Sequence, residues 1–160
     1  MFRRITSAIA TVALIAFFVA ACSSDSTTTT TTAAASSTTA ANASGTITVT
    51  LADVDANTML LTPTPTSAPA GEVTFEVTNS GDREHEFVVV QTDLALADLP
   101  FDAAADEVLE DEMTVVDEIG SIMPGETKTL TVTLESGGYA LICNLEGHFR
   151  KGMRAAFTVN

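Results

Sequence analysis

The stretch "MPGETKTLTVTLESGGYALICNLEGHFRKGMRAAFTVN", residues 123–160, carries the clearest signal of fold class in this chain of 160 residues. Within it, residues 127–134 alternate apolar and β-branched polar side chains, a pattern typical of a strand with one buried face. A Gly-Gly turn at 137–138 leads into two further apolar strands, expected at 139–144 and 153–160 and separated by a loop. These closely spaced strands indicate an all-β domain.

The segments upstream extend the same pattern. Residues 46–53 and 72–81 alternate apolar and polar side chains, whereas 85–92 is apolar more continuously and suits a central strand. The proline-rich segment 63–71 is expected to connect strands without entering a sheet, because proline cannot donate to a ladder. About seven or eight short strands separated by turn signals predict a β-sandwich.

Residues 93–123 differ from the rest, because they contain ten acidic side chains and no basic one. The part at 101–113, "FDAAADEVLEDEM", has a helix-forming composition. We therefore expect residues 93–123 to form an acidic, partly helical excursion outside the sheet. The acids of 93–118 are interpreted as a solubility feature.

The N-terminus reads as an export signal over residues 1–21, with two early arginines and an apolar run too short for a typical membrane span. Its end, "VAAC" at 19–22, resembles the lipobox of bacterial lipoproteins. That resemblance implies cleavage before Cys22 and lipidation of its thiol. The alternative is an ordinary cleaved signal with an incidental cysteine.

After Cys22, the chain is almost entirely Ser, Thr and Ala, which offers nothing to bury. Residues 22–44 are therefore expected to be a lipidated cysteine with a disordered tether, followed by a single domain at 45–160. These features predict an extracytoplasmic protein that is lipid-anchored to the cell membrane.

The charge of the chain excludes one class of partner. It has 21 acidic and seven basic side chains, for a formal charge of −14. Loss of Arg3 and Arg4 with the signal would leave five basic side chains and a formal charge of −16. Such an acidic protein is a poor ligand for phosphate backbones, so we expect no nucleic-acid partner.

The cysteines raise a question about Cys143, because the chain has only one other, Cys22. If Cys22 is lipidated, Cys143 has no partner for an intramolecular disulfide. An odd cysteine in an exported protein suggests intermolecular pairing, a reactive thiol or a metal ligand.

The spacing of nearby residues favours the metal. Cys143, His148 and Met153 follow one another at five-residue intervals, and the other histidine of the chain, His85, begins an upstream strand. Two imidazoles, one thiolate and a weak thioether form the ligand set of blue-copper sites. Taken singly, each residue also has an ordinary structural explanation, as a strand histidine, a buried thiol or a core methionine.

The segments "NSGDREHEFVV" (79–89) and 123–153 resemble the cupredoxin family, which includes plastocyanin, azurin and rusticyanin. The resemblance implies a Greek-key β-sandwich that binds one copper ion (Cu⁺/Cu²⁺, type 1). It also implies the ligands, namely His85, Cys143, His148 and Met153. One departure is Glu86, since many members have asparagine at this position, which helps to hold the thiolate loop.

The function expected from this resemblance is electron transport, without catalysis. A membrane-tethered monomer would carry single electrons between redox partner proteins, such as a cytochrome, an oxidase or a reductase, with His148 as the exit. Arg150, Lys151 and Arg154 are a candidate docking patch for an anionic partner. Ordinary solvated charge is the alternative.

Other functions remain open to different degrees. Extracytoplasmic copper storage or delivery is the main alternative, although such proteins favour clusters of exposed Met and His. A zinc site is conceivable for two histidines and a cysteine. A copper enzyme would need further histidines for a catalytic copper, and the chain has only two.

Overall fold

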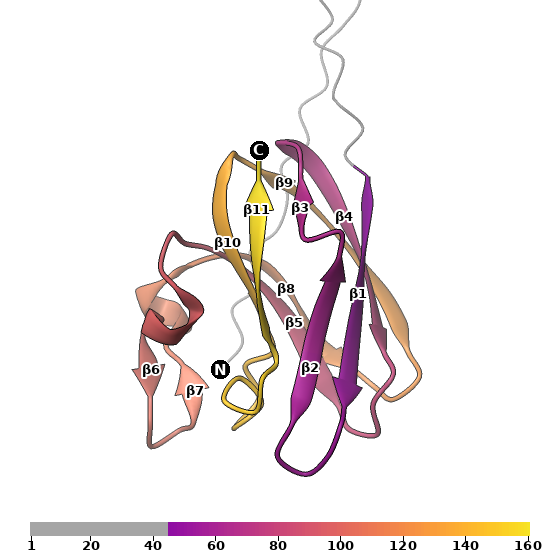
Figure 1. The fold of residues 1–160 in the computed structure, drawn as a ribbon, viewed down its shortest axis with the longest axis vertical. Helices are drawn as coiled ribbons and strands as arrows, with labels where there is room; N and C mark the ends of the chain where they lie inside the picture. The colour runs from indigo at the N-terminus through magenta and orange to yellow at the C-terminus, as the bar shows by residue number, and fades with distance from the viewer. Residues whose placement is uncertain (1–44) are drawn as a thin grey trace, which may run out of the picture. The chain divides into compact units, whose positions relative to one another are not determined.

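Strands β1, β2, β4 and β9 form the first of the two larger sheets in the computed structural model, which describes residues 45–160 (Figure 1). The expected signal at 1–21, the lipidation of Cys22 and the tether at 22–44 lie outside the described residues. The order is β2-β1-β4-β9, with β1 parallel to β4 and the other pairs antiparallel. The bounds are β1 Thr46–Asp53, β2 Met59–Thr64, β4 Gly71–Asn79 and β9 Thr127–Leu134.

The second sheet contains five strands in the order β3-β11-β10-β5-β8. Its strands are β3 Ser67–Ala68, β5 His85–Gln91, β8 Thr114–Ile122, β10 Gly137–Ile142 and β11 Arg154–Val159. β10 is antiparallel to both β11 and β5, so the end of β10 and the starts of β5 and β11 lie at the same end of the sheet.

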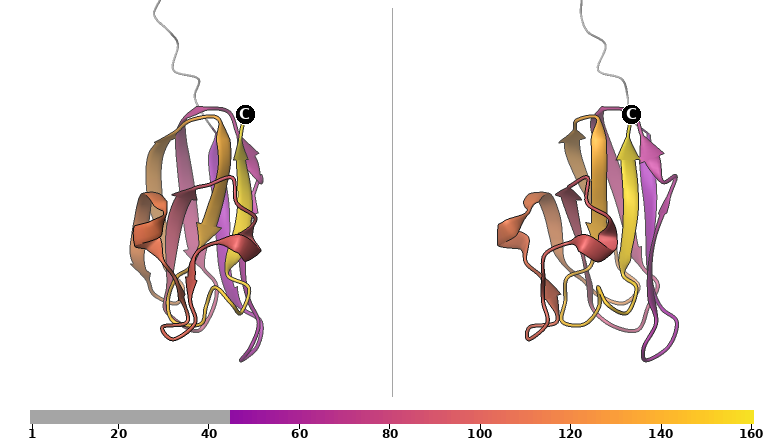
Figure 2. Two further views of the ribbon diagram at one scale, coloured as in Figure 1. Left: turned by 90° about the vertical axis from the view of Figure 1, so that its left-hand side faces the viewer. Right: turned by 60° about the vertical axis from the view of Figure 1, so that its left-hand side comes forward.

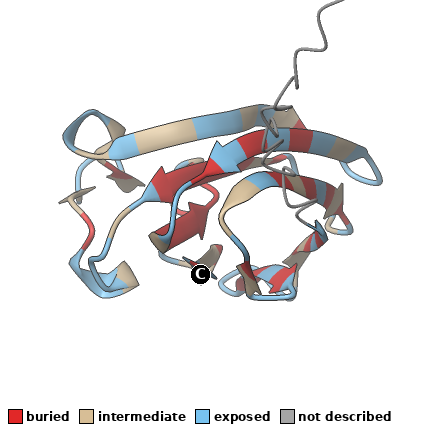
Figure 3. Ribbon diagram, turned by 90° about the horizontal axis from the view of Figure 1, so that it is seen from above, coloured by how far each residue is buried: buried red, intermediate tan, exposed pale blue. Residues whose placement is uncertain are grey.

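The core lies between the two sheets. The alternation read in the sequence places Ile47, Val49 and Leu51 of β1 inward, and Figure 3 shows buried and exposed segments alternating along the strands. Phe75 of β4 contacts Phe87 and Phe157 of the opposite sheet, at ring-centroid distances of 5.2 and 5.5 Å. The two-sheet, all-β architecture predicted from sequence is confirmed.

Residues 93–113 cover the outer face of the second sheet, as Figure 2 shows. A second buried cluster joins Leu99 and Val108 of this segment to Val88, Ile142 and Phe149. β5 is therefore apolar on both faces, which explains its continuous hydrophobic sequence. The segment comprises η1 Leu96–Asp98, β6 Phe101–Asp102, β7 Glu107–Val108 and η2 Glu110–Glu112.

Two expectations about residues 93–123 are corrected by the structure. Residues 114–122 were expected outside the sheet, but they form its edge strand β8 and pair with β5. Acids on β8, such as Asp117 and Glu118, suit an edge because exposed charge opposes pairing with other chains. The helical part of residues 93–113 consists only of two three-residue 3₁₀ turns.

The expectation that residues 63–71 stay outside the sheets is also wrong, because they include the end of β2 and all of β3, which pairs with β11. Pro63 lies within β2 and faces Val49 of β1. β2 is an edge strand, where a residue without an N–H group is tolerated. Eight strands have six or more residues, in agreement with the predicted seven or eight, and three two-residue strands bring the total to eleven. No helix within residues 45–160 is both long and apolar enough to cross a membrane.

Candidate metal centre

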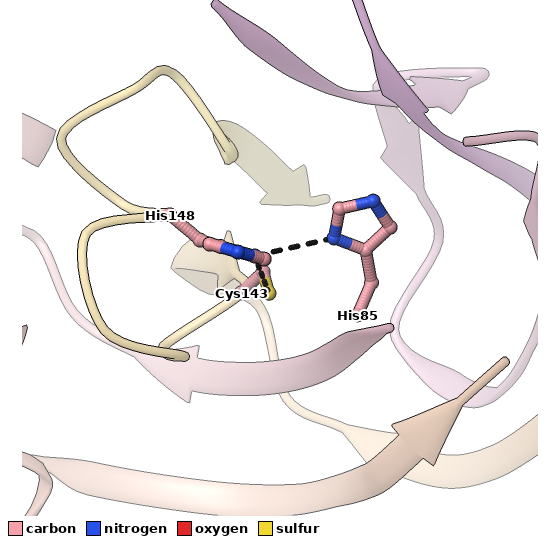
Figure 4. A group of neighbouring side chains, drawn as sticks. All are labelled: His85, Cys143 and His148. Carbon is pink, nitrogen blue, oxygen red and sulfur yellow. Dashed lines mark hydrogen bonds between the residues drawn. The ribbon is translucent and has the colours of Figure 1, made fainter. Parts of the chain in front are cut away.

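Three of the four predicted ligands converge at one end of the sandwich (Figure 4). His85 is the first residue of β5, Cys143 follows the end of β10, and His148 lies in the loop between β10 and β11. Their potential ligand atoms all lie within 4.8 Å of one another. The two Nδ1 atoms are 3.2 Å apart, and Cys143 Sγ lies 3.4 Å from His148 Nδ1.

The chemistry of these donors fits a metal ion. His85 and Cys143 are fully buried and His148 is 9% exposed. Desolvation on burial is the largest influence on all three groups. It lowers the pKa of both histidines and raises the pKa of the Cys143 thiol to about 11. Neutral imidazoles are ready to bind a cation, and a bound cation would deprotonate the thiol. The His₂Cys set fits one type 1 copper ion.

The backbone of the fourth predicted ligand, Met153, is hydrogen-bonded to the backbones of Cys143 and His148. Met153 is fully buried, its carbonyl accepts the N–H of Cys143 at 3.0 Å, and its own N–H donates to the carbonyl of His148 at 3.1 Å. These bonds close the loop at 143–153 on itself. A role for the Met153 sulfur as a metal ligand stays a prediction.

Two glycines allow this loop to fold tightly. Gly147 and Gly152 have φ values of +76° and +114°, which side chains other than glycine rarely adopt. A Cβ atom at Gly152 would lie 2.6 Å from the Met59 carbonyl oxygen. Met59 N in turn donates to the Lys151 carbonyl at 2.9 Å, so the loop rests against the start of β2.

Glu86 bonds to the thiolate loop from β5. Its N–H donates to Cys143 Sγ at 3.3 Å, and its Oε1 accepts the N–H of Asn144 at 2.5 Å. Burial raises the pKa of Glu86 to about 7, although the Asn144 N–H opposes the shift. A carboxylate therefore occupies the position at which the resemblance led us to expect asparagine, and it still contacts the loop.

Asn144 is a site residue that the sequence reasoning missed. Its side-chain Oδ1 accepts Val108 N at 2.7 Å, and its Nδ2 donates to Val108 O at 3.0 Å and to Glu110 Oε1 at 2.8 Å. Gly147 N also donates to the Asp106 carbonyl at 2.9 Å. Residues 106–110 of the acidic segment thus hold one side of the loop at 143–153. The composition of the segment does not predict this role.

One of the candidate docking residues, Arg150, contacts the same segment. Arg150 Nη1 lies 3.2 Å from Asp106 Oδ1, and its guanidinium lies 5.7 Å from the centre of the Phe101 ring. The guanidinium of Arg154 lies 4.7 Å from the centre of the Phe149 ring. The Arg150 side chain is still 59% exposed. These contacts do not test a docking role for Arg150, Lys151 and Arg154, which stays a prediction.

A buried His₂Cys set at the end of a two-sheet β-sandwich defines the class of single-site type 1 copper proteins. A family model described as a cupredoxin-like domain matches residues 10–156 of the chain. This protein therefore belongs to the cupredoxin-like domain family.

Solved structures of blue-copper proteins have the same fold. An azurin (Az-iso2) from Methylomonas sp. strain J is 20% identical, with a TM-score of 0.52 over 72% of this chain and 97% of that one. Rusticyanin from Thiobacillus ferrooxidans is 22% identical, with a TM-score of 0.51 over 72% and 77%. Auracyanin A from Chloroflexus aurantiacus, a "blue" copper protein, is 22% identical, with a TM-score of 0.50 over 72% and 100%. No curated protein sequence matches the chain.

Proposed function

We propose that this protein carries single electrons between extracytoplasmic redox proteins through one type 1 copper ion. The observation that carries the proposal is the convergence of two imidazole nitrogens and one thiol sulfur, all buried, at the end of a rigid sandwich. A copper ion bound there would supply one-electron chemistry, because this ligand set accommodates both of its oxidation states.

The fold of the protein holds the three ligand residues in place without a metal. His85 is held by the β5 ladder, and Cys143 and His148 are held by a loop that is bonded to β2 on one side and to the acidic segment on the other. Little rearrangement is then needed when the charge of the site changes. His148 is the most exposed of the three and would be the exit for the electron.

The same proposal includes the membrane anchor. Lipidation of Cys22, at the start of the Ser/Thr/Ala tether expected at residues 22–44, would hold the copper domain near the membrane that carries its partners. The support is the sequence pattern alone, namely the short apolar run, the cysteine and the Ser/Thr/Ala composition.

The two cysteines offer a matched test. We expect Cys143→Ser to abolish the intense blue colour of the oxidised, copper-loaded protein. Cys22→Ser should keep the colour but release the protein from the membrane fraction. A Cys143→Ser protein that stays blue would overturn the proposed site, and a Cys22→Ser protein that stays in the membrane would overturn the anchor.

Reversible redox behaviour separates electron transport from copper delivery. An electron carrier should bleach on reduction, regain its colour on reoxidation and retain its copper throughout. Loss of copper to a chelator on each reduction would favour delivery instead. The complete burial of His85 and Cys143 favours retention.

A further inference from the structure

Asp53 contacts the predicted ligand His85 from behind, on the side opposite the converging donor atoms. Asp53 is the last residue of β1, and its side chain is 11% exposed. Its Oδ2 lies 3.5 Å from His85 Nε2, and it accepts the backbone N–H groups of Asp82 and Arg83 at 2.8 and 3.1 Å. One carboxylate oxygen is therefore hydrogen-bonded to the turn before β5 and also lies close to the His85 imidazole.

The backbone of this turn is shaped to admit the carboxylate. A Cβ atom at Gly81 would lie 2.3 Å from Asp53 Oδ2, so glycine leaves the space that the oxygen occupies. The Asn79 amide braces the same turn, since its Oδ1 accepts Gly81 N at 2.9 Å and its Nδ2 donates to Arg83 O at 2.7 Å. The position of Asp53 beside His85 is thus determined by several contacts.

The Asp53 carboxylate matters because it faces the ring nitrogen of His85 that must carry the proton when the other nitrogen binds a metal. His85 Nδ1 faces the other donors, so metal binding requires its lone pair, and the ring proton must then sit on Nε2. Nε2 is buried and has no hydrogen-bond partner. A buried N–H without an acceptor destabilises the folded state. Asp53 Oδ2, at 3.5 Å, faces that nitrogen.

The charge of Asp53 also acts on the site. Burial alone would raise its pKa, but the N–H groups of Asp82 and Arg83 and the nearby His85 outweigh burial and lower the pKa. The other oxygen, Oδ1, is buried without a partner. A buried polar atom left unpaired in this way calls for an explanation beyond stability.

We propose that Asp53 is a positioning residue for the metal centre: its carboxylate accepts the Nε2–H of His85, which leaves Nδ1 free to bind the metal. Its negative charge also favours the cupric over the cuprous ion and so lowers the reduction potential. This inference rests on the proposed function, because it requires copper at His85. Partners of this kind in other metal sites change metal affinity by about 10–100-fold when they are replaced.

Asp53→Asn tests the role of the charge, because asparagine keeps an oxygen for the backbone donors of the turn. Asp55→Asn is the matched control. Asp55 lies two residues away, and its carboxylate also accepts a backbone N–H, that of Asn57 at 2.7 Å, but it is exposed. The full-length protein should be loaded with copper, and its cupric affinity and reduction potential measured for each variant.

We expect Asp53→Asn to weaken cupric binding about tenfold relative to cuprous binding, which equals a rise of about 59 mV in a one-electron potential. Asp55→Asn should change the potential much less. Equal potentials in the two variants would overturn the proposal. Wild-type protein that binds no copper would instead overturn the proposed function, so the two failures are distinguishable.

A second measurement needs no variant and no metal. Nitrogen-15 spectra of the imidazoles in the metal-free wild-type protein report which ring nitrogen of His85 carries the proton. The proposal expects the proton on Nε2, facing Asp53. A proton on Nδ1 would contradict it, whatever the stability of the Asp53 variants.

Discussion

The side-chain amide of Asn144 pairs with both backbone groups of Val108, accepting its N–H at 2.7 Å and donating to its carbonyl at 3.0 Å. Asn144 directly follows Cys143, and Val108 belongs to the acidic segment that covers the second sheet. The residue after the predicted thiolate is thus attached to a part of the chain about 36 positions away.

Asn144→Ala should therefore destabilise the metal-free protein by about 2 kcal/mol, because it leaves the buried Val108 groups unpaired. Copper should also be lost to a chelator faster, since the loop at 143–153 loses a support. Urea unfolding and chelator kinetics measure the two effects. Asn57→Ala, at an exposed position in the β1–β2 hairpin, is the control, and an equally small effect in both variants would contradict the assigned role.

Gly152→Ala should be more damaging than Gly125→Ala, although both glycines have positive φ. The conformational cost of alanine at such an angle, about 1–3 kcal/mol, applies to both. Only at Gly152 would the new methyl group also collide with the Met59 carbonyl, whereas nothing lies within 4 Å of a Cβ atom at Gly125. Thermal unfolding and the intensity of the blue band compare the two, and equal losses would exclude the collision as the cause.

Glu86 predicts a pH dependence of stability in the metal-free protein. Its pKa is about 7 in the folded state, against 4.5 for the unperturbed group. Between these values the folded state holds a proton that the unfolded state has released, so the contribution of Glu86 to stability falls as pH rises from about 4.5 to about 7. Below that window both states are protonated and the contribution is constant.

Glu86→Gln should remove this dependence while keeping an oxygen for the Asn144 N–H. The variant is then expected to gain stability relative to wild type as pH rises through the window, as urea unfolding at pH 4.5 and pH 8 would measure. Glu76→Gln, at an exposed position on β4, controls for the loss of one negative charge. A Glu86→Gln difference of the same size at both pH values would refute the prediction.

The triple exchange of Arg150, Lys151 and Arg154 for glutamine should slow electron transfer to an anionic oxidant such as ferricyanide. The difference from wild type should shrink at high ionic strength, because salt screens exposed charge. Stopped-flow kinetics at several salt concentrations test this, with Lys128→Gln as a control outside the ligand loop. Rates that are unchanged and independent of salt would exclude a docking role.

Local sequence patterns predicted the strands well. The alternation in 46–53, 72–81 and 127–134 follows from the period of two along a strand, and each of these segments overlaps a strand of the structure. The same reasoning failed for residues 114–122. Their acids suggested a solvated excursion, but an edge strand with one exposed side accepts acidic residues equally well.

The sequence by itself determined the donor atoms of the candidate site, because Cys143 and His148 lie five residues apart in one loop, and a short loop keeps its own residues close. The tertiary structure decided everything that joins this loop to the rest of the chain. His85 meets His148 across 63 positions, Asp53 lies behind His85, and Val108 pairs with Asn144. Such contacts depend on which strands pair and how the layers stack, and residue patterns within a single segment do not specify the partners of that segment.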